Sequence, residues 1–130
     1  MARQFSDQER RHFAAALKRV GLAWQARLQD EDFYALDYFD LFTEIWLREG
    51  EDVIKTDCYR FMSGMSRQTA KKYVQRAIER GHLIERDNPR DKRSKLISLS
   101  PRIKALIEQN FDHAATALRK ALRRCRPMEN

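Results

Sequence analysis

Cationic and amide side chains are concentrated in one short stretch of the sequence, residues 66–76. Lysine and arginine neutralise phosphates, while arginine, glutamine and hydroxyl side chains also form hydrogen bonds with the edges of bases. The predicted binding residues of the stretch are Ser66, Arg67, Gln68, Thr69, Lys71, Lys72, Gln75 and Arg76. Two roles stay open for Thr69, because its position suits either the binding face or packing.

A second basic group follows at residues 90–95, between two short apolar runs at residues 82–85 and 96–99. The segment that joins these runs combines turn-forming residues with charges, which is typical of a β-hairpin with a long loop. Cations on such a loop can follow the nucleic-acid backbone beside a helix. The predicted contacts in this loop are Arg90, Lys92, Arg93 and Lys95.

The stretch at residues 66–76 is predicted to lie on a helix. Ser66 is suited to cap its N-terminus, because the side-chain oxygen can accept a hydrogen bond from a free backbone N–H. Apolar residues at spacings of three and four define a buried face opposite the cations. These residues are Ala70, Tyr73, Val74, Ala77 and Ile78. Gly81 predicts the end of the helix, because glycine tolerates the left-handed backbone that commonly ends one.

The helix and hairpin together resemble the DNA-binding module of the MarR family of transcriptional regulators. Members of that family show a serine-led recognition helix, a glycine at its end, an Asp-x-Arg wing tip, and a strand that closes in Leu-Thr. The corresponding residues here are Ser66, Gly81, Asp91-Lys92-Arg93 and Leu99-Ser100-Pro101, with ten residues from the glycine to the aspartate. The match covers about a quarter of the chain and is specific as a set.

The resemblance implies a fold and a function. The expected fold is mainly α with a small β-hairpin, a winged helix-turn-helix with N- and C-terminal dimerisation helices. The implied function is that of a sequence-specific transcriptional regulator, expected to be a repressor, which binds double-stranded DNA as a homodimer on a pseudo-palindromic operator. In the family, the wing aspartate braces the loop by pairing with basic neighbours and the arginine reaches the minor groove. Asp91 and Arg93 are expected in those roles.

The whole chain, residues 1–130, is expected to form one MarR-like domain. Residues 33–100 would form the DNA-binding lobe, and residues 1–30 and 101–126 the dimerisation helices. Apolar stripes along both terminal helices favour this division. The predicted interface residues are Phe13, Leu17, Val20, Trp24, Ile107, Phe111, Leu118 and Leu122. Two alternatives stay open: the first stripe could be a core face, and the last helix could return along the first helix of its own chain.

An acidic connection at Gln29–Asp32 is expected to lead into a second helix at residues 33–48, whose aromatic residues would centre the core. Val53-Ile54 is expected to add a short strand to the hairpin. The region from Asp30 to Asp52 holds nine acidic residues against Arg48 alone. This segment should therefore lie away from DNA.

Thr56 is expected to cap the first helix of the helix-turn-helix. The turn that follows allows two alignments. In one alignment, Arg60 and Ser63 occupy the inward positions. In the other, an extra residue in the turn places Cys58 and Met62 inward. The tilt of the recognition helix depends on which alignment holds.

The net charge of +7 is unevenly distributed along the chain. Residues 55–104 hold 14 Lys/Arg against 5 Asp/Glu, a net charge of +9, whereas residues 1–54 carry −4 and residues 105–130 carry +2. A basic excess confined to one module is expected of a protein that neutralises phosphates. The alternative function is a winged-helix module that binds an acidic protein partner without specific DNA binding, because a fold does not fix a function.

Other classes of function find no support in the sequence. A Gly-rich phosphate loop, a nucleophile elbow and a metal-ligand spacing are all missing, which argues against an enzyme, a cofactor and a metal site. Cys58 and Cys125 suggest no disulfide framework. No apolar run approaches the ~20 residues of a membrane span, so a cytoplasmic protein is expected. Members of the resembled family often sense small aromatic ligands, so a small-molecule effector is a candidate partner, with no residue assigned to it.

Overall fold

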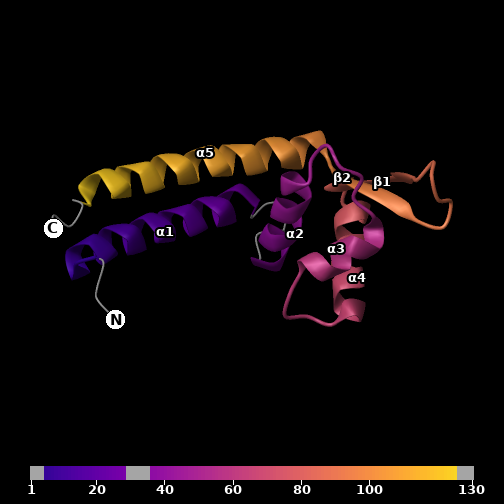
Figure 1. Cartoon of the computed structure of the whole chain (residues 1–130), viewed down its shortest axis with the longest axis horizontal. Helices are drawn as coiled ribbons and strands as arrows, with labels where there is room; N and C mark the ends of the chain where they lie inside the picture. Colours follow the sequence, from indigo (N-terminus) through magenta and orange to yellow (C-terminus); the bar gives the residue numbers. More distant parts are fainter. Residues whose placement is uncertain (1–4, 29–35, 126–130) are drawn as a thin grey trace.

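The computed structural model describes residues 5–28 and 36–125, which form five helices and a two-stranded hairpin (Figure 1). In chain order they are α1 (Asp7–Leu28), α2 (Leu36–Leu47), α3 (Lys55–Phe61), α4 (Arg67–Glu79), β1 (Leu83–Asp87), β2 (Lys95–Leu99) and α5 (Pro101–Arg124). The predicted fold class, mainly α with a small hairpin, is confirmed. The acidic connection and the predicted start of the second helix, at residues 29–35, lie outside the described residues.

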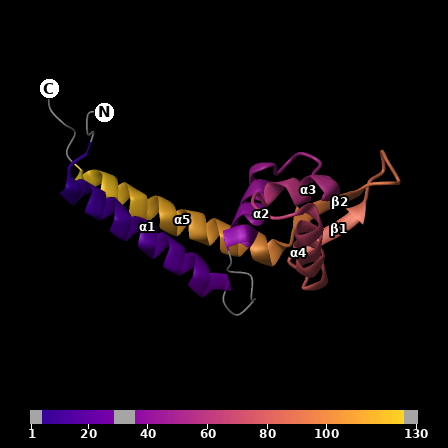
Figure 2. The ribbon, with the colours of Figure 1, turned by 90° about the horizontal axis from the view of Figure 1, so that it is seen from below.

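The molecule has an elongated part and a compact lobe. Figures 1 and 2 both show α5 running back alongside α1 in the opposite direction, while α2, α3, α4 and the hairpin gather at the other end. Small or buried residues let the two long helices approach closely, among them Ala16, Ala117 and Ala121. Arg27 Nη1 also donates to Asn110 Oδ1 across 3.3 Å. The long last helix therefore covers the first helix of its own chain.

Local capping sets where the two long helices begin. Before α1, Ser6 and Glu9 form a capping box in which the Glu9 backbone N–H donates to Ser6 Oγ at 3.1 Å and the Ser6 N–H donates to Glu9 Oε1 at 2.9 Å. Before α5, Ser100 Oγ accepts from the Ile103 N–H at 3.2 Å. Pro101 occupies the first helical position, where no N–H is lost.

The hairpin has a third, very short neighbour. β1 pairs with β2 in antiparallel register from Leu83 opposite Leu99 to Asp87 opposite Lys95. Ile54 forms a single bridge with Leu96, and the Ile97 N–H donates to Val53 O at 2.8 Å. The predicted strand at Val53-Ile54 is thus present as one bridge.

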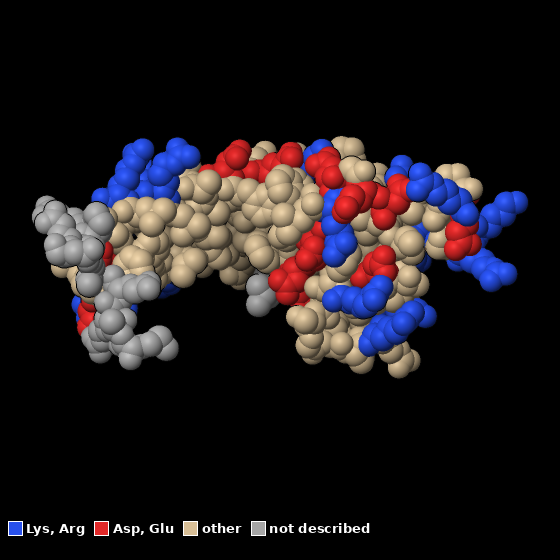
Figure 3. Space-filling view, in the orientation of Figure 1, with Lys and Arg blue, Asp and Glu red and all other residues tan. Residues whose placement is uncertain are grey.

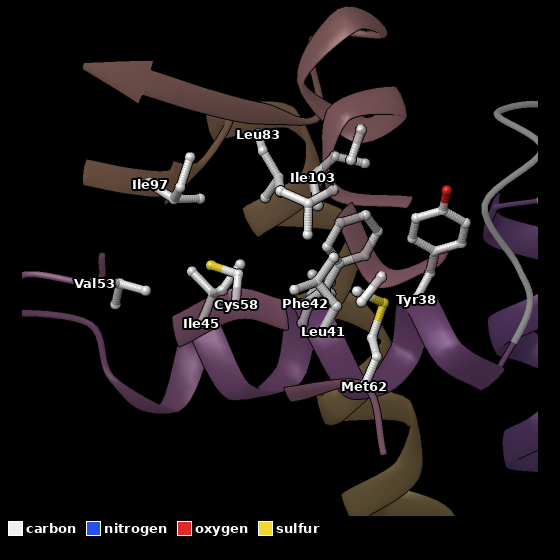
Figure 4. Close-up of a cluster of buried hydrophobic side chains, with 14 of the residues drawn as sticks. Tyr38, Leu41, Phe42, Ile45, Val53, Cys58, Met62, Leu83, Ile97 and Ile103 are labelled. Carbon is white, nitrogen blue, oxygen red and sulfur yellow. The ribbon is translucent and has the colours of Figure 1, made fainter. Parts of the chain in front are cut away.

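One apolar core joins the lobe to the first turns of α5. Figure 4 shows side chains from α2, α3, β1, β2 and α5 pointing toward one another. The members include Tyr38, Leu41, Phe42, Ile45, Cys58, Met62, Leu83, Ile97 and Ile103. Trp24 and Leu28 at the end of α1 belong to the same cluster, with Trp24 packed edge-on against Phe39 at a ring separation of 4.9 Å.

The burial pattern selects one alignment of the helix-turn-helix. Cys58 and Met62 are buried, whereas Arg60 and Ser63 are exposed, so the turn contains the extra residue. The predicted cap at Thr56 is wrong, because α3 begins at Lys55 with Ile54 at the cap position and no side-chain cap. The bridge that Ile54 makes with Leu96 fixes the chain there, and the helix starts directly after it.

Among the described residues, no helix is long and apolar enough to cross a membrane.

Candidate nucleic-acid interface

Both ends of α4 are fixed by the residues that the sequence singled out. Ser66 caps the N-terminus, with the Thr69 backbone N–H donating to Ser66 Oγ at 3.1 Å. At the other end, the His82 N–H donates to Ala77 O and the Gly81 N–H to Ile78 O, at 2.9 and 3.0 Å. This is a Schellman arrangement, and it requires the positive φ of 78° that Gly81 adopts.

The two faces of α4 differ in the way that the periodicity predicts. Ala70, Val74 and Ala77 are buried against the core. All of the predicted binding residues on the helix are exposed: Ser66, Arg67, Gln68, Thr69, Lys71, Lys72, Gln75 and Arg76. The exposed face therefore combines cations with amide and hydroxyl groups, the side chains that contact phosphates and base edges.

Thr69 belongs to the exposed face. Its hydroxyl accepts a hydrogen bond from Ser66 Oγ at 3.0 Å, and neither side chain is buried. Thr69 therefore does not pack in the core, and its contact with nucleic acid stays a prediction.

Aromatic contacts hold α4 against its neighbours. Tyr73 stacks on Tyr38 of α2 with ring centroids 5.0 Å apart, and Tyr38 Oη donates to the Tyr73 carbonyl at 3.3 Å. The Arg67 guanidinium lies 5.7 Å from the ring centroid of Tyr59 in α3, within reach of a cation–π interaction. Because both α2 and α3 contact α4 in this way, the contacts fix the position of α4 in the lobe.

Lys55 and Tyr59 were not predicted from the sequence as part of this surface. Together with α4 residues they line an open groove. Lys55 Nζ lies 3.3 Å from Gln75 Oε1 and forms an ion pair with Glu85 of β1. The sequence feature that could have identified them is their spacing, because residues four positions apart on a helix lie on the same side of it.

The loop between the strands, residues 88–94, forms the wing. Asn88 at its base is buried; its Nδ2 donates to Ser94 Oγ at 2.9 Å, and its Oδ1 accepts from the Arg90 N–H at 3.0 Å. Asp91 Oδ1 accepts from the Arg93 N–H at 3.0 Å. Asp91 thus holds the tip through the backbone. Sequence reasoning missed Asn88.

The wing cations are not equivalent. Arg90, Lys92 and Arg93 are exposed, and Arg90 Nη1 lies 3.9 Å from Asp52 Oδ2. Lys95 instead forms an ion pair with Asp87, and this hydrogen bond raises the pKa of Lys95 and lowers that of Asp87. Lys92 and Arg93 are therefore the two wing cations without an ion pair among the described residues.

The wing and α4 lie at the same end of the molecule, remote from the far ends of α1 and α5 (Figure 1). Figure 3 shows basic side chains at this end and a second basic group near the end of α5, with acidic side chains between them. Acidic side chains accordingly separate the two basic regions on this face.

The residues predicted for a subunit interface fall into three groups by burial. Trp24 and Ile107 are buried within the single chain. Phe13, Val20, Phe111 and Leu118 are partly buried. Leu17 and Leu122 leave 61% and 58% of their surface exposed.

No family model matches the sequence, and no curated protein is similar enough in sequence to match. Solved structures do share the fold, all at low sequence identity. A transcriptional regulator from Thermotoga maritima is 18% identical with a TM-score of 0.64, over 88% of this chain and 78% of that one. A MarR family transcriptional regulator from Streptomyces coelicolor, in complex with DNA, is 18% identical with a TM-score of 0.56, over 85% and 71%.

BpsR of Bordetella bronchiseptica, whose DNA binding is regulated by 6-hydroxynicotinic acid, is 21% identical with a TM-score of 0.51, over 93% of this chain and 84% of that one. The capped helix α4 is followed by the braced wing and then by the long helix α5. This is the order of the recognition helix, the wing and the next helix in the family that the sequence resembles. The chain therefore has the winged helix-turn-helix fold of MarR-family transcription regulators.

Proposed function

We propose that the protein is a sequence-specific regulator of transcription that binds double-stranded DNA as a homodimer, with α4 as the recognition helix and repression as the expected outcome. The observation that carries the proposal is the exposed face of α4. It presents Arg67, Gln68, Lys71 and Lys72 to solvent while the opposite face packs on the core. Solved structures of the same fold include one in complex with DNA.

The geometry suits one half of an operator. A B-DNA major groove admits one α-helix, so α4 would enter it with its N-terminal turns nearest the base edges. The wing would follow the adjacent backbone, with Arg93 directed to the minor groove. The hydrogen bonds of Asn88 at its base and Asp91 at its tip support a defined loop shape in the absence of DNA.

A homodimer would supply the second half-site. Leu17 and Leu122 are large apolar side chains exposed on the paired helices α1 and α5. A second copy packed there would remove them from water. Two-fold symmetry would then place two recognition helices roughly 34 Å apart, one turn of DNA, on a pseudo-palindromic sequence.

The proposal is tested by selecting bound fragments from random DNA with the purified protein at two salt concentrations. We expect enriched sequences with two inverted half-sites whose centres lie about one helical turn apart. Affinity for them should fall steeply as salt rises, because counterions are released from the phosphates. If no sequence is enriched and an acidic protein binds the basic face instead, the alternative function, a winged-helix protein-interaction module, replaces this one.

Two variants test the assigned surface directly. Lys71→Ala and Arg93→Ala should each weaken operator binding by about 1–3 kcal/mol if they contact bases, or lower the salt slope if they contact phosphate. Arg119→Ala is the matched control, an exposed cation on α5 far from the wing. Equal effects of all three substitutions would contradict the assignment.

A further inference from the structure

A second cluster of basic side chains lies apart from the α4 and wing surface. It lines a crevice of about 360 Å³ between α1 and the second half of α5. The basic members are His12, Arg19, His113, Lys120 and Arg124, and this group is called the basic crevice below. None of the described residues that line it is acidic.

Three cations of the basic crevice have no hydrogen-bond or ion-pair partner within the described part of the chain. Arg19, Lys120 and Arg124 form no hydrogen bond or ion pair there. Nε2 of His113 is buried and has no hydrogen-bond partner among the described residues. Like charges held close together repel one another, and the attraction of a bound anion to each of them would offset the cost of that repulsion.

One carboxylate borders the basic crevice. Glu9 lies in an adjoining depression that shares His12 and Arg124 with it. The Ser6 backbone N–H donates to Glu9 Oε1, and this hydrogen bond lowers the pKa of Glu9. The carboxylate is therefore charged, and its Oε1 takes part in the cap of α1. It sits at one end of the crevice, nearly three turns from Arg19 along α1.

The basic crevice lies on the opposite edge of the helix pair from the exposed leucines. Leu122 is two residues from Lys120, which places the two side chains about 200° apart around α5. Leu17 and Arg19 are related in the same way on α1. A second copy packed on the leucine edge would leave the crevice accessible.

We propose that the basic crevice binds a small anion that carries a phosphate group. Arginine guanidinium groups match phosphate oxygens in a bidentate manner, lysine adds a point charge, and imidazole N–H groups donate hydrogen bonds. The floor contains Ala117 and Ala121, which are small and buried. The volume is at the lower end of the range for ligand pockets, so a phosphate monoester with a small organic group would also fit.

The histidines provide a local readout. The chain has three histidines, two of which line the basic crevice, while the third, His82, is buried at the end of α4. Burial lowers the pKa of His82, which keeps its ring neutral at about pH 7. Ring signals of the full-length protein would be followed by NMR as inorganic phosphate is added, with acetate at equal ionic strength as the comparison. Phosphate should shift the His12 and His113 signals to saturation and leave His82 unchanged.

Substitution separates a site from general attraction to a basic protein. Lys120→Gln should weaken phosphate binding at the crevice histidines by about tenfold or more, which is typical for loss of a charge-assisted contact. Arg123→Gln, a neighbouring cation that does not line the crevice, should leave it unchanged. The proposal is overturned if acetate and phosphate act alike, if the shifts do not saturate, or if the two variants weaken binding equally.

A second titration identifies the source of the phosphate group. Glycerol 3-phosphate would be compared with inorganic phosphate under the same conditions. Tighter binding of the ester identifies an organic phosphate as the ligand, and equal binding identifies the phosphate group alone. Loss of DNA binding in another variant would not affect this readout, because it reports only the ring signals at the crevice.

Discussion

At the scale of the residue, the shape of the wing depends on Asn88, a buried polar side chain among exposed cations. It joins the Ser94 hydroxyl to the Arg90 backbone N–H across the base of the loop. Asn88→Ala leaves both groups without this partner and should cost about 1 kcal/mol locally. We expect faster amide exchange at residues 90 and 94 and operator binding weakened roughly fivefold.

Asn88→Asp is the matched comparison, since it keeps an acceptor for the Arg90 N–H and loses only the donor to Ser94. Its amide exchange at residue 90 should stay slow. Unchanged exchange in the alanine variant would show that the wing holds its shape without this side chain.

Cys58 is the other residue whose surroundings give a definite expectation. Burial, followed by the nearby charge of Asp57, raises the pKa of Cys58 to about 12. Since the thiolate is the reactive form, its fraction is very small at neutral pH and grows only as pH approaches that value. Alkylation followed by mass spectrometry should show native Cys58 protected and the partly exposed Cys125 modified first. Rapid labelling of Cys58 without denaturant would contradict this burial.

At the scale of the element, the cap of α4 can be tested separately from its charges. Ser66→Ala removes the acceptor for the Thr69 N–H and should lower the free energy of unfolding by about 1 kcal/mol, the usual cost of losing a cap. Ser63→Ala, an exposed serine in the preceding turn, should change it by less than about 0.5 kcal/mol. Urea unfolding of both variants measures the difference, and equal midpoints would mean that α4 does not depend on its cap.

Helix α4 and the turn before it show which features of the fold can be predicted from the sequence alone. Ser66 and Gly81 were predicted correctly because caps depend on residues three or four positions away. The alignment of the preceding turn stayed open, because only burial against α2 and the hairpin distinguishes Cys58 from Arg60. Long-range pairing also explains why the cap expected at Thr56 is wrong: the bridge between Ile54 and Leu96 starts α3 earlier.

The candidate site likewise contains some residues that the sequence predicted and others that only the structure identified. Exposure of the α4 cations followed from periodicity, since apolar positions predict which face turns inward. The contributions of Lys55 and Tyr59 required the packing of α3 beside α4, and that of Asn88 required the closed loop. Residues that act through contacts distant in sequence carry no local pattern by which they could be recognised.

At the scale of the whole molecule, the two ends of the chain have different surfaces. The lobe presents cations on α4 and the wing, while the paired helices α1 and α5 present leucines along one edge and the basic crevice along the other. The buried positions Trp24 and Ile107 tie the helix pair to the lobe through the shared core. A change of packing along the helices would therefore reach the lobe through that core.

The prediction for the whole molecule concerns the edge of the helix pair on which Leu17 and Leu122 are exposed. Leu122→Asp places a charge where a second copy would bury an apolar side chain, so it should convert a dimer into monomers in sedimentation equilibrium. Losing the second recognition helix removes the gain from bivalent binding, and operator affinity should fall by about a hundredfold or more. Leu47→Asp is the control, because Leu47 is exposed to a similar degree, 65%, at the end of α2. If the unsubstituted protein is monomeric at micromolar concentration, or if both variants remain dimeric, the two helices do not form the subunit interface and the two-fold model of operator binding fails with it.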